Sequence, residues 1–180
     1  MSHEKVKSIC IDEENNKVFI NCASNNVRPL SYSREEYPFF SKILKEKGKE
    51  AVEIELLSCY DSGTLQDGKN KYTKALKVLY YVLKEEYNKF DWRNNWEEFK
   101  KNKDSQEYKD LLKKCLNYKF PKSKFIITKI TYDGDCYGKR CLTCMKWFRD
   151  KDKATKFDFK EEAENNIFKE YKDVWEVMEI

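Results

Sequence analysis

Three cysteines near the end of the chain have a spacing that can bind metal. Cys136, Cys141 and Cys144 lie in DGDCYGKRCLTC and are spaced C-x4-C-x2-C. A C-x2-C pair at a turn can bind Zn²⁺ from two sides, but a structural zinc site needs four ligands and only three are local. The sequence therefore favours a hairpin end whose cysteines are small, half-buried hydrophobic residues, with no cofactor. If zinc were bound, these three thiols would be its ligands.

Acid, base and nucleophilic groups form no pattern typical of a known reaction. The only histidine is His3, in an N-terminal segment that we expect to be frayed, so triads built on histidine are excluded. A single histidine also excludes metal sites with two histidines. The chain has no P-loop and no GxGxxG. The tripeptide EYK, half of a metal-dependent nuclease signature, occurs at residues 107–109 and 170–172. The sequence predicts a protein that is not an enzyme. The alternative is a small metal-dependent nuclease or nucleotide-processing enzyme that uses Asp and Glu.

Positive charge is concentrated after residue 110. Residues 111–156 hold 13 basic and 4 acidic side chains, whereas residues 157–180 hold 3 basic and 8 acidic ones. Aromatic rings stand among the cations of KRCLTCMKWFRDKDKATK. Lysine and arginine neutralise phosphates, and an aromatic ring can stack on an unpaired base. We therefore expect nucleic acid to be bound by Lys139, Arg140, Lys146, Trp147, Arg149, Lys151 and Lys153.

The faces of the segment CMKWFRD decide which of these groups can act together. In a strand, Lys146 and Phe148 share one face, while Trp147 and Arg149 share the other. Trp147 beside Arg149 would offer a stacking plane and a guanidinium group. Two alternatives stay open. The segment is a solvated strand with one aromatic residue in the core, or the acidic end of the chain covers the basic patch.

Periodicity and turn residues place these groups on a series of short elements. Alternating apolar residues predict a β-hairpin over residues 6–22, and a polar connection follows. Steps of three and four predict helices, with Asp104 expected to cap one of them. The helices are expected over 38–48, 51–60, 72–90, 104–117 and 167–178, with a short aromatic helix over 90–101 and strands over 124–132 and 144–150.

These elements predict an α+β protein. We expect a single compact domain in which amphipathic helices pack on small antiparallel hairpins or a sheet. Its parts are a hairpin and loop over 1–35, a helical part over 36–118, a basic hairpin region over 119–160 and an acidic closing helix over 161–180. The 27 aromatic residues supply core area although 38% of the 180 residues are charged.

Apolar runs and cysteine usage point to a cytoplasmic protein. No apolar run approaches 18 residues, and the N-terminal segment lacks the pattern of a signal peptide. Seven cysteines, an odd number, are typical of reduced thiols. We expect no membrane partner.

The size, the Lys-, Asn- and Tyr-rich composition and the lack of a reaction motif resemble small accessory proteins of bacteriophages and mobile elements. Among these the chain is similar in character to anti-CRISPR inhibitors. The resemblance implies a non-catalytic protein of the host bacterial cytoplasm that binds nucleic acid, a nucleic-acid-processing enzyme such as a CRISPR effector nuclease, or both, and inhibits that nuclease. A structural module that binds protein alone is the second alternative.

Overall fold

The computed structural model describes residues 4–23, 32–67, 70–90 and 96–180, and the statements below refer to these residues. Helices combined with antiparallel sheets confirm the predicted α+β class. The chain divides into two compact units, Met1–Tyr118 and Lys119–Ile180, each of which is described by itself. The division coincides with the predicted border between the helical part and the basic hairpin region. That the whole chain is one domain stays a prediction.

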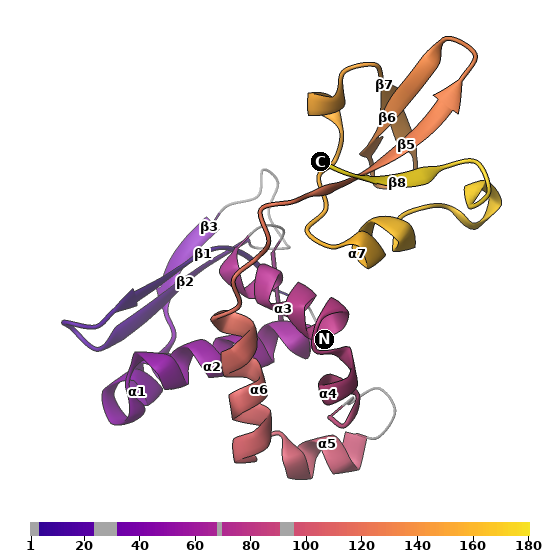
Figure 1. The fold of residues 1–180 in the computed structure, drawn as a ribbon. Helices are drawn as coiled ribbons and strands as arrows, with labels where there is room; N and C mark the ends of the chain where they lie inside the picture. The colour runs from indigo at the N-terminus through magenta and orange to yellow at the C-terminus, as the bar shows by residue number, and fades with distance from the viewer. Residues whose placement is uncertain (1–3, 24–31, 68–69, 91–95) are drawn as a thin grey trace. The chain divides into compact units, whose positions relative to one another are not determined.

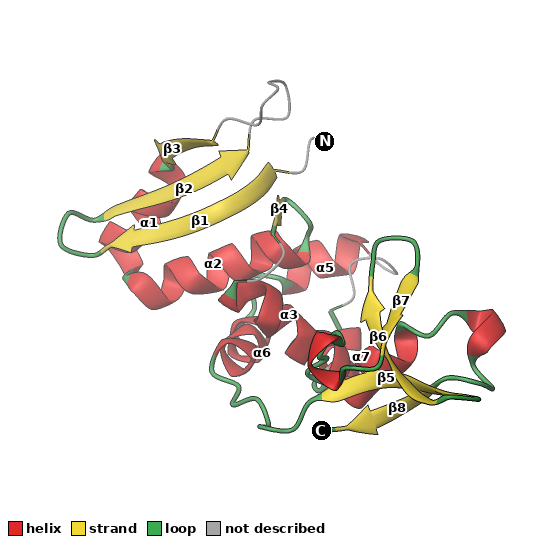
Figure 2. Ribbon diagram, turned by 90° about the horizontal axis from the view of Figure 1, so that it is seen from above, coloured by secondary structure: helices red, strands yellow, loops and turns green. Residues whose placement is uncertain are grey.

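The sheet of the first unit is built on the predicted N-terminal hairpin. Strands β1 (Glu4–Asp12) and β2 (Lys17–Ala23) pair antiparallel, and the order in the sheet is β3-β2-β1-β4 (Figure 2). The short β4 (Leu65–Gln66) runs parallel to β1. Strand β3 (Tyr32–Glu36) lies where a polar connection was predicted, so that prediction is wrong here. An edge strand needs little apolar pattern, because pairing with β2 supplies its backbone hydrogen bonds.

Two predicted helices follow and are confirmed. Helix α1 (Pro38–Lys47) begins at the proline, whose missing N–H costs nothing in a first turn. It ends at Gly48, whose φ of 82° favours glycine and whose N–H donates to the Leu44 carbonyl. Helix α2 (Lys49–Asp61) starts directly after this glycine and buries Val52, Leu56 and Leu57.

The predicted helix over 72–90 is split into α3 (Lys71–Tyr81) and α4 (Lys84–Asn88). The N–H groups of Val82 and Leu83 both donate to the Val78 carbonyl, which closes α3, and α4 starts after Leu83. Apolar periodicity continues across this break, so it could not be found from the pattern. The break matters for packing because residues of both helices contact the same buried carboxylate.

The last helices of this unit are α5 (Trp96–Asn102) and α6 (Gln106–Leu116). Ser105, not Asp104, caps α6, because its Oγ accepts the Tyr108 N–H at 3.2 Å. Phe90 and Phe99 are buried as expected of a packed aromatic segment, whereas Trp96 is half exposed. Trp92, another aromatic residue of the helix predicted over 90–101, lies outside the described residues.

A buried carboxylate ties these helices together. Asp61, at the end of α2, is 4% exposed and accepts hydrogen bonds from three tyrosine hydroxyls. Its Oδ1 lies 3.1 Å from Tyr80 Oη and 3.0 Å from Tyr87 Oη, and its Oδ2 lies 3.0 Å from Tyr108 Oη. We call these four residues the tyrosine–carboxylate cluster.

The second unit contains a four-stranded antiparallel sheet of order β7-β6-β5-β8 (Figure 1). Its strands are β5 (Phe125–Thr131), β6 (Gly134–Arg140), β7 (Met145–Phe148) and β8 (Glu176–Glu179). We expected residues 133–143 to be a loop between two strands, and this is wrong, because residues 134–140 form β6. GDCYGKR has no β-branched residue, and Tyr137 is its only aromatic one, so its composition indicates a strand only weakly.

The predicted acidic closing helix over 161–180 is also wrong. Helix α7 (Lys160–Asn165) is short, and the chain then returns as β8, whose Val177 pairs with Ile127 of β5. Apolar residues over 167–178 recur at helical spacing, but the apolar edge of β5 offers a better partner to this segment. Helices long and apolar enough to cross a membrane do not occur among the described residues.

Candidate nucleic-acid interface

The β6–β7 ladder sorts the predicted site residues between the two faces of the sheet. Paired residues in an antiparallel ladder point to the same face, and neighbours along a strand alternate. The lysine face consists of two directly opposite pairs, Tyr137 with Phe148 and Lys139 with Lys146. The tryptophan face consists of the pairs Gly138 with Trp147 and Arg140 with Met145. The predicted separation of Lys146 and Phe148 from Trp147 is therefore confirmed.

The lysine face carries unbalanced positive charge. Lys139 and Lys146 are both exposed, and neither forms an ion pair with any described residue. Like charges directly opposite on neighbouring strands destabilise a sheet. The next pair along, Tyr137 and Phe148, is partly buried. Two exposed cations thus stand beside two partly buried rings, and neither cation has an ion-pair partner among the described residues.

The turn after β7 adds two further predicted lysines. Lys151 and Lys153 belong to a short 3₁₀ turn (Lys151–Lys153) and are exposed. Lys153 Nζ lies 5.9 Å from the centroid of the Phe148 ring and 3.9 Å from a carboxylate oxygen of Asp150. Four of the seven residues expected to bind nucleic acid therefore belong to β6, β7 and this turn as exposed lysines.

Arg140 lies on the tryptophan face and its guanidinium group is already bonded. Nε donates to Asn166 Oδ1 at 3.2 Å, and Nη1 donates to the carbonyls of Cys141 at 2.7 Å and Cys144 at 3.3 Å. The group also lies 4.9 Å from the Phe168 ring centroid. Arg140 thus stabilises the β6–β7 turn, and we leave it out of the proposed interface.

Trp147 and Arg149 both contact other residues of the second unit, and their expected role as a stacking plane and guanidinium group for nucleic acid stays a prediction. Trp147 packs edge-on against Trp175 with ring centroids 4.7 Å apart, and it belongs to the hydrophobic cluster of this unit. Arg149 Nη1 donates to the Asp135 carbonyl and Nη2 to Thr131 Oγ1, with Asp133 Oδ2 at 3.7 Å. Both side chains therefore support the sheet.

Trp147→Ala is expected to loosen the second unit, by about 2 kcal/mol for a half-buried ring with an aromatic partner. Hydrogen exchange of the β5–β8 amides, read by mass spectrometry on the full chain, should become faster. Exchange in the helices of the first unit is the internal control. Unchanged exchange in β5–β8 would show that the ring supplies no packing.

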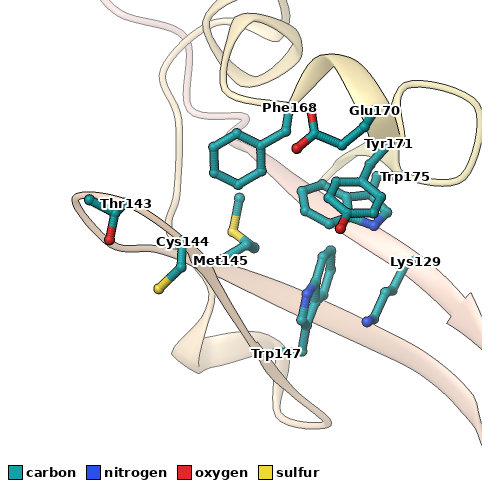
Figure 3. A pocket seen from close by; sticks show the side chains of 9 residues that line it. All are labelled: Lys129, Thr143, Cys144, Met145, Trp147, Phe168, Glu170, Tyr171 and Trp175. Atoms are coloured by element: carbon teal, nitrogen blue, oxygen red, sulfur yellow. The ribbon is translucent and has the colours of Figure 1, made fainter.

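The tryptophan face also contains a pocket of about 400 Å³ (Figure 3). Four aromatic side chains, from β7 and from the segment before β8, form most of its wall, and Lys129 and Glu170 are its charged groups. We call it the aromatic pocket. Its lining is Lys129, Thr143, Cys144, Met145, Trp147, Phe168, Glu170, Tyr171 and Trp175. Sequence reasoning missed this pocket because Phe168, Tyr171 and Trp175 were assigned to the apolar side of a closing helix.

The three cysteines proposed for zinc are not gathered at one point. Cys136 lies within β6, whereas Cys141 and Cys144 flank the β6–β7 turn, where the Cys141 N–H donates to the Cys144 carbonyl at 2.9 Å. Five residues of extended strand separate Cys136 from Cys141 by roughly 17 Å. In the part of the chain that the structure describes, no group of three or more His, Cys, Asp or Glu is placed to hold a metal. The absence of a cofactor stays a prediction.

Comparison of the chain with protein-family models, with curated proteins and with solved structures gives no match.

Proposed function

We propose that the second unit binds single-stranded nucleic acid through its lysine face and acts by binding rather than by catalysis. The observation that carries this proposal is the direct pairing of Lys139 with Lys146 across β6 and β7, without a counter-ion among the described residues. A phosphate at this position would place one negative charge within reach of two cations whose Cβ atoms are about 5 Å apart. It would turn an unfavourable pair into a favourable one.

The rings beside the lysines favour a single strand over a duplex. The Tyr137–Phe148 pair is two residues further along the ladder, about 7 Å from the lysine pair. One nucleotide can therefore place its phosphate at the lysines and its base on a ring. Bases in a duplex are stacked on each other and cannot use these rings, whereas every unpaired base has a face to offer.

Salt dependence tests the interface directly. Removing both cations, in Lys139→Ala combined with Lys146→Ala, removes the contact with one phosphate. The magnitude of the slope of log K against log salt should therefore fall by about 0.7 on a single-stranded oligonucleotide, since each lost phosphate contact releases about 0.7 fewer counterions. Fluorescence anisotropy of a labelled oligonucleotide, with Mg²⁺ present, measures the slope and shows whether the strand stays intact. Cleavage of the strand would contradict a purely binding role.

Matched controls separate this surface from the general positive charge. Lys45→Ala with Lys47→Ala removes the same charge from α1 and should leave the slope unchanged. Lys139→Glu should abolish most of the binding while adding about 0.2–1 kcal/mol to stability, because a carboxylate opposite Lys146 forms a favourable cross-strand pair. If this charge-reversed protein bound the oligonucleotide as tightly as the parent, the lysine face would not be the interface.

Inhibition of a nucleic-acid-processing enzyme, such as an RNA-guided nuclease, is a wider proposal that the resemblance suggests. An inhibitor that occupies a single strand would compete with such an enzyme for its substrate. The Lys139→Glu protein should then lose inhibition together with binding.

A further inference from the structure

The aromatic pocket has ring surfaces set at steep angles to each other. Tyr171 stacks on Trp175 with centroids 4.4 Å apart and planes within 8°, whereas Trp147 meets Trp175 at 73°. Phe168 meets the same indole at 66°, with centroids 5.8 Å apart. In Figure 3 these side chains surround one open space. Rings at such angles can hold a flat ligand by a face and by an edge at once.

Two charged groups give the pocket polarity. Lys129 Nζ lies 4.4 Å from the centroid of the Trp147 ring, so a cation already occupies this aromatic surface. A cationic ligand would be repelled by that ammonium group. Glu170 also lines the pocket, is exposed and forms no ion pair with any described residue. The pocket therefore offers one ammonium donor and one carboxylate acceptor to a flat ligand without positive charge.

From this chemistry we infer that the aromatic pocket binds a guanine base of an unpaired nucleotide. Guanine carries two neighbouring N–H donors, at N1 and N2, and a carboxylate can accept both in parallel. Its O6 is an acceptor for an ammonium group such as Lys129. Adenine and cytosine place a ring acceptor beside their amino group, and uracil and thymine offer one N–H. Glu170 thus selects guanine.

The place of the pocket in the sheet connects it to the lysine face. The two sites use opposite faces of β7, and β7 is the edge strand of its sheet. A single strand bound at Lys139 and Lys146 can pass around this open edge and insert a base on the other side. The inference therefore rests on the proposed function, to which it adds a base preference. A volume of about 400 Å³ is within the range of small-ligand pockets.

Calorimetric titration of the full-length protein with the four ribonucleoside monophosphates tests this inference. GMP should bind at least about tenfold more tightly than AMP, CMP or UMP, the discrimination expected of one bidentate pair. Glu170→Gln should bring GMP to the affinity of AMP, since the amide presents one acceptor. Glu179→Gln replaces an exposed carboxylate on β8 by a carboxamide and should keep the preference for GMP. Tyr171→Leu should weaken all four nucleotides by at least about fivefold through lost stacking.

Oligonucleotides separate this inference from the proposed function. One guanine placed in an oligothymidine should tighten binding by the parent about tenfold and binding by Glu170→Gln hardly at all. Salt-dependent binding of oligothymidine with no gain from guanine would overturn the guanine pocket and leave the lysine face standing. GMP binding without oligonucleotide binding would overturn the lysine face alone. Equal affinity for all four nucleotides, or none for GMP, would overturn the pocket assignment.

Discussion

Asp61→Ala should lower the free energy of unfolding by about 3–5 kcal/mol. The substitution removes the acceptor of three tyrosine hydroxyls in the tyrosine–carboxylate cluster, two of which, on Tyr87 and Tyr108, belong to fully buried side chains. Each buried hydroxyl that loses its acceptor costs about 1–3 kcal/mol. The loss is a property of the first unit, because all four residues belong to it. Urea unfolding of the full chain, followed by circular dichroism, measures it.

Two control variants make this result specific. Tyr80→Phe removes one of the three donors and leaves Asp61 bonded to the other two, so about 1 kcal/mol should be lost. Asp104→Ala removes an exposed carboxylate that does not cap α6, and it should change stability by less than about 0.5 kcal/mol. An Asp61→Ala protein as stable as the parent would show that the hydroxyls find other partners and that the cluster does not hold the helices together.

Local signals predicted the first unit well. Pro38 and Gly48 marked both ends of α1, and the apolar alternation of residues 6–22 indicated the first hairpin. The tyrosine–carboxylate cluster left no such signal. Its tyrosines lie 19, 26 and 47 residues from Asp61, so their convergence on this carboxylate depends on how four helices pack. The break between α3 and α4, which no pattern marked, is part of that packing.

In the second unit, the alternation of side chains along β7 predicted which residues share a face of the sheet. It did not predict which segments cover each face. Lys146 and Trp147 were placed correctly on opposite sides of one strand. Which side is available to a ligand depends on Trp175 and on the segment before β8, and this segment was expected to be a helix. The apolar residues over 167–178 recur at helical spacing, so the sequence did not indicate that Trp175 packs on Trp147. The same error concealed the aromatic pocket.

The two units use their polar groups differently. In the first, Asp61 and its tyrosines satisfy one another inside the structure, which favours stability. In the second, Lys139 and Lys146 oppose each other at the surface, which costs stability. A stability cost that a single substitution could remove is typical of a functional site. This contrast is why we place the function in the second unit.

Alkaline pH should unfold the first unit. Burial raises the pKa values of Tyr60, Tyr72, Tyr87 and Tyr108 well above the ordinary value of 10.0, and the negative charge of Asp61 adds to the rise for Tyr87 and Tyr108. A group whose pKa is raised on folding contributes its full stability below the pKa of the unfolded chain. That stability is lost as the pH rises toward the pKa of the folded state. Each tyrosine then costs up to about 1.4 kcal/mol per pH unit, so four together cost up to about 5.5 kcal/mol per unit above pH 10.

A buried thiol makes the same effect measurable at lower pH. Burial raises the pKa of Cys115 from 9.0 to about 12, so the unfolded chain releases this proton from about pH 9, before its tyrosines ionise. Stability measured by urea unfolding should therefore already fall between pH 9 and pH 10. Cys115→Ala should make that fall shallower by up to about 1.4 kcal/mol per unit, whatever it does to stability at pH 7. Cys144→Ala removes an exposed thiol from the second unit and should keep the slope of the parent. If Cys115→Ala left the slope unchanged, Cys115 would ionise as readily in the folded protein as in the unfolded chain, and the packing of α6 around it would be looser than this structure shows.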